Sequence, residues 1–486
     1  MGGTMIMELL PLFLCVLACL FGGLCILGFY RQRRPGEPPL DKGWIPWLGH
    51  VLTFRRDTAK FLQRMIQQHG DVFTIQLGGF YVTFLQDPLS FGAFVKESRE
   101  KLSFNAFAKH LVQRVFGHKG TGNEHSILDA ASQKHLKGHG LQIMTESMMS
   151  NLQNLMLHHL GSGANQNRWK EEGLFNYCYN IVFRAGYLAL YGNATTQTEG
   201  DEEKARAKDR TESEVLFHEF RKYDKLFPNL AYGVLTPKGK REANRLLSFF
   251  WDTLSMERMK SKENISGWIW DMSHMQREEG VQESMIDRHM FVLLWASQGN
   301  TGPSSFWLLF YLMKHPDAME AVRNEVLKVL KESGQEVRPG GPLVNLTHEM
   351  LMKTPVLDSA VEETLRLVAA PLLTRSVLQD MTLKMADGRE FLIRKGDRMA
   401  IFPYIAVHTD PEIHPDPFTF KYDRFLTPEG TKKTDFYKGG KRQFVFLMLV
   451  YFDFELMNPD EKIPHIDPNR WDLEPCNQTE KYRTRF

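Results

Sequence analysis

The segment from Trp295 to Lys314 restricts the possible fold more than any other part of the chain. It is a long apolar stretch of helical character, but polar residues, two glycines and a proline interrupt it between Ser297 and Pro303. Inside a buried helix a glycine costs about 1 kcal/mol relative to alanine, and a proline costs about 3 kcal/mol. Helices that keep such residues usually widen or kink there, often at functional sites. The segment therefore predicts an interrupted helix, which is either a kinked core helix or part of a binding site.

The composition allows a large hydrophobic core and disfavours a nucleic-acid partner. Of the 486 residues 43% are hydrophobic, and 60 basic against 58 acidic residues give a formal net charge of +2. Nucleic-acid binders usually carry a strongly basic face. The five cysteines form no CxxC pair, and Cys15, Cys19 and Cys25 lie in one apolar N-terminal run. Neither a zinc site nor a disulfide framework is therefore expected.

An uncharged apolar run extends from Leu9 to Phe29. About 20 apolar residues span a bilayer, and three arginines between residues 31 and 34 follow the run at once. By the positive-inside rule these arginines place the rest of the chain in the cytosol. Because no basic residue stands between the start Met and the run, we expect an uncleaved signal anchor. The expected parts are a transmembrane anchor at 1–30, a basic, proline-rich hinge at 31–43 and a folded domain at 44–486.

The remaining pattern is mainly α-helical, with a small β part. A β-hairpin is expected from Asp71 to Leu85, where two β-rich runs flank Gly78-Gly79. Apolar residues at three-to-four spacing predict helices at 91–100, 109–116, 128–160 and 175–191, and from Glu214 to about Glu332. The polar stretch 193–213 is expected to be a mobile loop, 333–345 a connector, and 382–385, 390–393 and 399–402 short strands.

Glu363 and Arg366 lie three residues apart on a predicted helix and therefore share a face. An exposed pair of this kind contributes little to stability. Here the pair lies among apolar residues, and a buried pair needs further partners. Arg424 could supply one, since its guanidinium can bind the same carboxylate in a forked geometry.

Together with the interrupted helix, these residues resemble a known family. Glu363-x-x-Arg366, followed by Arg424, resembles the Glu/Arg/Arg signature of the cytochrome P-450 family, and the segment 298–301 resembles that family's oxygen-binding helix. The anchor, the hinge and the early hairpin fit as well, so the resemblance covers essentially the whole chain. It implies a cytochrome P-450 fold, a haem cofactor and electrons from NADPH through a membrane-bound cytochrome reductase. It also implies a single-pass location in the endoplasmic reticulum membrane, with the catalytic domain in the cytosol.

Within that family the chain is most similar to the branch that holds sterol 12α-hydroxylase and prostacyclin synthase. The shared text is long and specific, at 33–43, 45–49, 299–303, 354–358 and 408–415. The segments 134–138, 219–222 and 464–471 are more similar to the sterol hydroxylase. The resemblance implies a monooxygenase that hydroxylates a sterol at carbon 12, in bile-acid metabolism. The alternative is a prostacyclin-synthase-like endoperoxide isomerase, which needs neither a reductase nor external dioxygen.

The resemblance also assigns roles to single residues. Thr301 would help to deliver protons to bound dioxygen, and Asn300, where most of the family has an acid, would hold a water or a substrate oxygen. Trp295 would form a wall of the sterol pocket, and Arg375 would pair with a haem propionate. From the residues alone, Thr301 could equally bond to the carbonyl one turn earlier. Trp295 could likewise be an ordinary core residue, and Arg375 an exposed residue at a strand edge.

The chain departs from the family at one critical place. The proximal haem loop, with the cysteine that ligates the iron, is missing between Arg442 and Gln443. In the family that thiolate pushes electron density to the iron and favours O–O cleavage. Cys178 lies in a helical pattern, and Cys476 follows the domain without the glycines of such a loop, so neither replaces it. We therefore expect weak or no haem binding, no monooxygenase activity and poor stability, which adds a haem-free, non-catalytic membrane protein as a third possibility.

Overall fold

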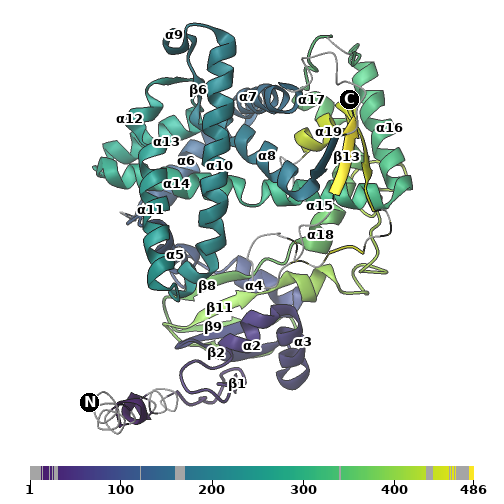
Figure 1. Cartoon of the computed structure of the whole chain (residues 1–486). Helices are drawn as coiled ribbons and strands as arrows, with labels where there is room; N and C mark the ends of the chain where they lie inside the picture. The colour runs from purple at the N-terminus through teal and green to yellow at the C-terminus, as the bar shows by residue number, and fades with distance from the viewer. Residues whose placement is uncertain are drawn as a thin grey trace, which may run out of the picture. The chain divides into compact units, whose positions relative to one another are not determined.

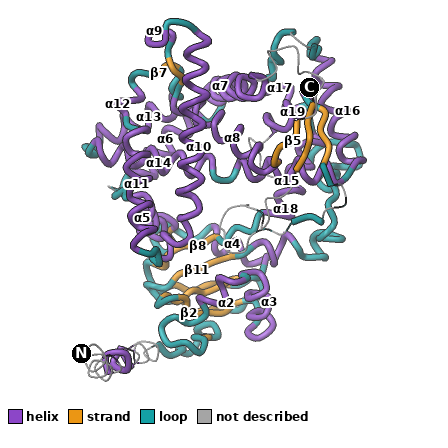
Figure 2. The backbone as a smooth tube through the Cα atoms, viewed as in Figure 1, coloured by secondary structure: helices purple, strands orange, loops and turns teal. Residues whose placement is uncertain are grey.

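The computed structural model describes residues 13, 15–20, 22–23, 26, 31–120, 122–158, 170–338, 341–433, 442–458, 460, 462–464, 466, 475 and 481–485. Helices predominate, and the strands are short (Figure 2). The expected fold class, mainly α with a small β part, is therefore confirmed. The chain divides into two compact units, which we call unit 1 (Met1–Ala108 and Ala370–Pro417) and unit 2 (Lys109–Ala369 and Phe418–Phe486).

Most of the predicted membrane anchor lies outside the described residues. Within it the structure describes residues 13, 15–20, 22–23 and 26, all of them helical. Across the described part of the chain we find no helix whose length and apolar character would let it span a bilayer. The anchor therefore stays a prediction from the sequence.

Unit 1 is built on a six-stranded sheet with the strand order β1-β2-β3-β11-β8-β4, beside which β9 and β10 form a separate pair. Its strands are β1 Leu40–Asp41, β2 Val72–Leu77, β3 Phe80–Leu85, β4 Leu102–Ser103, β8 Leu373–Val377, β9 Met381–Lys384, β10 Glu390–Ile393 and β11 Arg398–Ile401. Its helical segments are α2 Val51–Arg56, α3 Thr58–His69, η1 Pro88–Ser90, α4 Phe91–Val95, the π-helical turn η3 Tyr404–His408 and the start of α5 Phe104–Phe116. The three short strands expected after residue 380 are thus present as β9, β10 and β11.

The predicted hairpin is confirmed as β2 and β3, which pair antiparallel along their whole length. Gly78 and Gly79 form the turn with φ of +57° and +81°, a backbone region that glycine enters without steric cost. Phe73 and Phe84, one from each strand, are fully buried in a cluster that includes Phe61 of α3. The hairpin is therefore anchored through one apolar face of the sheet.

Ion pairs hold the hinge at 31–43 to the rest of unit 1. Arg31 donates to both carboxylate oxygens of Asp397, each at 2.7 Å. Glu37 is buried and binds the Arg394 guanidinium, with one contact of 2.7 Å between Nη2 and Oε2. The hinge contains no helical residue, as expected, and these contacts fix its path up to β1.

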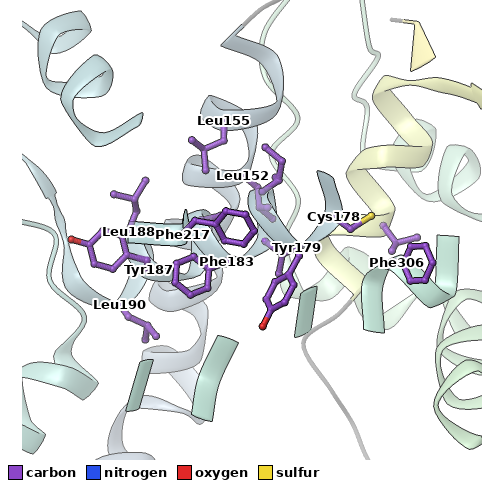
Figure 3. Packing of buried hydrophobic residues seen from close by; sticks show 14 of the residues in the cluster. Leu152, Leu155, Cys178, Tyr179, Phe183, Tyr187, Leu188, Leu190, Phe217 and Phe306 are labelled. Carbon is purple, nitrogen blue, oxygen red and sulfur yellow. The ribbon is translucent and has the colours of Figure 1, made fainter. Parts of the chain in front are cut away.

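Unit 2 is a helical body around one hydrophobic core (Figure 1). Its described helices are α6 Glu124–His135, α7 Gly138–Leu157, α8 Leu174–Tyr191, α9 Thr196–Glu199, α10 Glu202–Tyr232, α11 Pro237–Thr253, α12 Met256–Met259, α13 Gly267–Glu278, α14 Glu283–Gln298, α15 Thr301–Lys314, α16 Pro316–Glu332, α17 His348–Met352, α18 Pro355–Val368 and α19 Arg442–Tyr451, with the greater part of α5. Two small sheets pair β6 Asn193–Ala194 with β7 Lys262–Glu263, and β5 Lys170–Gly173 and β12 Asp453–Leu456 with β13 Lys481–Arg485. Helix α8 lies in the middle of the core, packed against α7, α10 and α15 (Figure 3).

The prediction of a mobile loop at 193–213 is wrong, because most of this stretch is the first part of α10. Of the three residues that face inward here, Ala205 is apolar, but Asp209 and Ser213 are polar. Asp209 accepts a hydrogen bond from the Asn193 amide at 2.9 Å, and Ser213 accepts one from Arg184 at 3.0 Å. Since polar side chains form most of the buried stripe, the apolar periodicity that normally reveals a helix is weak.

Other predicted elements differ mainly at their ends. The helix predicted at 128–160 is two helices, α6 and α7, which meet at Gly138, a glycine with φ of +51°. Helix α4 ends at Val95, before the predicted end, whereas α5 begins at Phe104, before the predicted start. The helix predicted at 175–191 is confirmed as α8.

Candidate functional site

The helix predicted at 295–314 is interrupted, as expected. Gly299 and Asn300 form a turn between α14 and α15. One backbone hydrogen bond spans the end of α14, from the Gly299 N–H to the Trp295 carbonyl at 3.0 Å. Asn300 and Thr301 therefore lie at a local break within an otherwise apolar helical segment.

Hydroxyl groups at the break donate back to backbone carbonyls one turn earlier. Thr301 Oγ1 donates to the Ser297 carbonyl at 3.3 Å. Ser304 and Ser305 donate in the same way, to the carbonyls of Asn300 at 2.5 Å and of Thr301 at 2.8 Å. The Thr301 contact is the one expected of a helix hydroxyl with a purely structural role. Asn300 makes no capping hydrogen bond and is exposed, so its amide can bind a water or another polar group.

Glycines let α8 approach the break closely. A Cβ atom at Gly302 would stand 2.5 Å from the Tyr179 ring and 2.9 Å from the Tyr179 Cα. A Cβ atom at Gly186 in α8 would stand 2.1 Å from the side-chain oxygen of Gln298. Substitution of Gly302 would push the helices apart because it meets the Tyr179 backbone, whereas substitution of Gly186 would displace the Gln298 side chain.

Trp295 lies in the last turns of α14 and contacts two aromatic rings. It stacks on Phe227 of α10 with ring centroids 4.4 Å apart, and the Phe116 ring centroid lies 5.5 Å away. The indole Nε1 is buried and has no hydrogen-bond partner among the described residues. A buried N–H without an acceptor is costly unless a water or a bound molecule accepts from it. The stacking is consistent with a core tryptophan and the unpaired N–H with a pocket wall, so both interpretations stay open.

The structure brings Glu363, Arg366 and Arg424 together in one buried cluster. Arg366 donates to both carboxylate oxygens, through Nε at 2.7 Å and Nη2 at 2.9 Å. Arg424 Nε donates to the same carboxylate at 2.8 Å, which is the shared contact that the sequence predicts. The Glu363 side chain is 0% exposed, and those of Arg366 and Arg424 are 3% and 9% exposed. One buried carboxylate thus pairs with two buried guanidinium groups.

Backbone groups complete this cluster, and side-chain spacing could not have revealed them. The Lys421 N–H donates to Glu363 Oε1 at 3.0 Å, and the Phe425 N–H donates to the Ser359 hydroxyl at 3.0 Å. These bonds attach helix α18 to the chain segment that begins after Phe418.

Arg375 lies on β8 in unit 1 and is half-buried. Its Nη1 donates to the Phe94 carbonyl at 2.7 Å, and the guanidinium carbon lies 4.6 Å from the centroid of the Phe94 ring. Burial and the nearby Arg99 lower the pKa of Arg375. A guanidinium has five N–H donors, so Arg375 retains donors for an anion beside these contacts.

Cys178 is the cysteine that the structure places in the folded core. It lies on α8, is 0% exposed, and packs in the same cluster as Phe306 (Figure 3). Burial raises the pKa of its thiol well above the usual range, and the carboxylate of Glu172 adds to the effect. The group is therefore a protonated thiol, whereas a metal ligand must be a thiolate.

Comparison with known proteins identifies the family. The model of the cytochrome P-450 family matches residues 38–439, so the chain belongs to the cytochrome P-450 family of monooxygenases. The chain is 45% identical to 7-alpha-hydroxycholest-4-en-3-one 12-alpha-hydroxylase of Homo sapiens, with 98% of each chain covered. It is 43% identical to prostacyclin synthase of Homo sapiens, over 90% of this chain and 91% of that relative. Among solved structures, retinoic acid bound cyanobacterial CYP120A1 is similar with a TM-score of 0.66 at 20% identity, covering 92% of this chain and 99% of that one. The predicted fold and branch are thereby confirmed.

The family implies a haem, and the described residues do not provide the thiolate that its iron requires. Cys178 is buried and protonated. The other described cysteines, Cys15 and Cys19, belong to the segment before the hinge, and Cys25 and Cys476 lie outside the described residues. Arg375 could pair with a propionate, but an arginine cannot ligate the iron. The donor set of the described chain therefore does not fit a haem-thiolate centre.

Proposed function

We propose that this chain is a sterol 12α-hydroxylase-like cytochrome P-450 that lacks the haem-ligating thiolate and is therefore inactive as a monooxygenase. The substrate class rests on the 45% identity with the human 12-alpha-hydroxylase, whose name states a sterol substrate. The lack of activity rests on one observation above the others, which is that the one cysteine in the described core is a buried, protonated thiol.

Two features of the comparisons support a deletion between Arg442 and Gln443. The family match ends at residue 439, just before this point. The alignment with the human 12-alpha-hydroxylase runs over 502 positions although this chain has 486 residues, so the relative contains residues that this chain lacks. Without the loop, the chain has no thiolate to hold the iron, and we expect weak or no haem binding.

The helix that follows the proposed deletion is firmly packed. Phe446 and Leu447 of α19 are both 0% exposed, and Tyr451 at its end donates to the Gln153 side chain of α7 at 2.7 Å. The Tyr451 hydroxyl also accepts from the Val344 N–H at 2.7 Å. Helix α19 therefore packs in the core of unit 2 without the proposed loop. We expect the loss of stability to come mainly from the missing loop and haem.

We assign the residues at the helix break to positioning roles that need the missing loop. Asn300 would hold a water or a substrate oxygen with its exposed amide. Thr301 would help to deliver protons through its hydroxyl group. Trp295 would form part of the sterol pocket, with its unpaired indole N–H available to a substrate oxygen. Arg375 would bind a propionate.

The cellular setting is likewise a proposal. We place the chain in the endoplasmic reticulum membrane by the anchor at 1–30, with the hinge at 31–43 and the domain at 44–486 on the cytosolic side, where NADPH-cytochrome reductase would dock. Alkaline carbonate extraction of microsomes tests the anchor. The full chain should stay in the membrane pellet, and a variant without residues 1–30 should leave it.

A loop-restoration experiment tests the proposed function. The haem loop of the human 12-alpha-hydroxylase would be inserted between Arg442 and Gln443, once with its cysteine and once with serine at that position. With NADPH and reductase, the cysteine form should convert 7-alpha-hydroxycholest-4-en-3-one to a 12-hydroxylated product. The unaltered chain and the serine form should give none. Hydroxylation by the unaltered chain would contradict the proposal.

A second function is supported by the 43% identity with human prostacyclin synthase. An isomerase of this kind would act on an endoperoxide without NADPH. The loop-restored protein separates the two functions, because a hydroxylase depends on NADPH and the isomerase does not. The hydroxyl of Thr301 favours the hydroxylase, since an isomerase has no dioxygen to protonate. If only the loop-restored protein is active, the unaltered chain is the haem-free, non-catalytic form.

A further inference from the structure

A cavity of about 410 Å³ lies in unit 2 at the end of α8, between the first half of α10, the end of α11 and the β6–β7 pair. None of the residues that line it belongs to the helix break or to the Glu363 cluster. It is therefore a separate feature, and it does not depend on haem.

Lys262 supplies a cation deep in this cavity. Its side chain is 12% exposed, and its ammonium donates to the Tyr187 hydroxyl at 2.8 Å. Burial opposes the charge, but the Tyr187 oxygen and the carboxylate of Glu212 outweigh this effect and raise the pKa of Lys262. The ammonium is therefore charged at neutral pH. As an acceptor from Lys262, the Tyr187 hydroxyl keeps its own proton available for a second partner.

The counter-ion of Lys262 is loosely placed. Glu212 Oε2 lies 3.7 Å from the ammonium, which is too long for a hydrogen bond, and the Glu212 side chain is 43% exposed. Two further cations line the cavity, Lys208 and Arg258, and both pair with acids that are not among the lining residues. Glu212 is the acid that lines the cavity itself. An incoming anion would therefore compete with one exposed carboxylate for Lys262, while Lys208 and Arg258 stay paired with Glu199 and Asp252.

Apolar side chains also line the cavity. Val215 of α10 is 50% exposed although it lines the cavity, and Phe249 of α11 is another lining residue. Lys208, Glu212 and Val215 lie about one helical turn apart and share a face of α10. The cavity thus combines a buried cation with an uncovered apolar surface within one space, which is the complement of an amphipathic anion.

We propose that this cavity binds an amphipathic organic anion, with its carboxylate or sulfate at Lys262 and Tyr187 and its hydrocarbon body on Val215 and Phe249. The anion would replace Glu212 as the partner of Lys262. Recognition needs both halves of the ligand, because the ammonium attracts any anion but the apolar wall gains only from a hydrocarbon body.

Equilibrium dialysis of radiolabelled octanoate against the full chain in lipid nanodiscs tests the proposal, with empty nanodiscs to subtract uptake by the lipid. We expect saturable binding that octyl sulfate displaces, and that neither octan-1-ol nor inorganic sulfate displaces at the same concentration. Displacement by inorganic sulfate as effective as by octyl sulfate would overturn the apolar half of the proposal. Equal displacement by octan-1-ol would overturn the ionic half.

Two surface variants locate the site without removing a buried group. Val215→Glu places a carboxylate at the apolar wall and should weaken octanoate binding about tenfold by charge repulsion. Glu212→Gln removes the lining acid and should tighten the binding several-fold. Lys240→Gln on the exposed surface of α11 is the matched control and should leave it unchanged. Octanoate binding that none of these substitutions alters, or no saturable binding at all, would overturn the site.

Discussion

Replacement of Glu363 by glutamine should destabilise the protein strongly, because it removes the carboxylate charge that pairs with two buried arginines. The carboxylate accepts two hydrogen bonds from Arg366, one from Arg424 and one from the Lys421 N–H. Glutamine keeps the shape but carries one oxygen instead of two and no charge. Its NH₂ group would face donors where an acceptor is needed.

The size of the effect follows from burial. Because Glu363 is 0% exposed and Arg366 is 3% exposed, water cannot replace the lost acceptor. Breaking a buried pair from one side costs about 3–5 kcal/mol, since the remaining charge stays buried without compensation. Glu349→Gln is the matched control: it breaks the Glu349–Lys353 pair, whose atoms lie 3.1 Å apart and whose side chains are 81% and 54% exposed. Such an exposed pair is worth about 0.2–1 kcal/mol.

Urea unfolding of the full chain in nanodiscs, followed by circular dichroism, measures both variants. The Glu363→Gln curve should shift to much lower urea concentration, or the variant should fail to accumulate as folded protein, while the Glu349→Gln curve stays close to the parent. A free energy of unfolding that changes by the same small amount in both variants would refute the account of the cluster.

Three further predictions concern packing, pH and the helix break. Gly302→Ala should destabilise unit 2 by about 1–3 kcal/mol through overpacking against Tyr179. The control Gly92→Ala in α4, where no atom lies within 4 Å of the new Cβ, should be neutral or stabilising. Thermal unfolding that ranks the two variants in the reverse order would contradict the close helix contact. Burial raises the pKa of Glu325 from 4.5 to about 7 although it accepts from the Val356 and Leu357 N–H groups, so its stabilising contribution is complete below pH 4.5 and is lost as the pH rises through about 7. Glu325→Gln should remove that part of the pH dependence of unfolding, and parallel pH curves for the two proteins would contradict the assignment. In the loop-restored, cysteine-containing protein, Thr301→Val should lower the product formed per NADPH oxidised by about a hundredfold if the hydroxyl carries protons. Thr301→Ser keeps a hydroxyl and should retain most of this yield. Equal yields from both variants would leave Thr301 with only its structural hydrogen bond.

The fold could be predicted from the sequence wherever a local signal and the packing agree. Gly78 and Gly79 mark the hairpin because glycine enters the positive-φ region of the turn without strain. Helix α8 could be recognised because nearly all of it is buried, so apolar residues fill most of its positions. The start of α10 could not be found in this way, because its buried face includes Asp209 and Ser213. These two residues stabilise the helix only through hydrogen bonds to partners on other elements.

The candidate site shows the same division. The cluster of Glu363, Arg366 and Arg424 could be predicted because opposite charges in an apolar setting need one another. The contribution of the Lys421 N–H could not, since every residue except proline carries that group. The stacking of Trp295 on Phe227 also depends on how α10 and α14 meet, which spacing within either helix does not encode.

The carbon-monoxide difference spectrum of the reduced, unaltered chain tests the central claim most directly. The account predicts no thiolate-type Soret band from this chain, and a normal band once the loop with its cysteine is inserted between Arg442 and Gln443. The serine form of the loop should restore packing but not the band. A thiolate-type band from the unaltered chain would show that one of its own cysteines ligates the iron, and the proposed loss of monooxygenase activity would then be wrong.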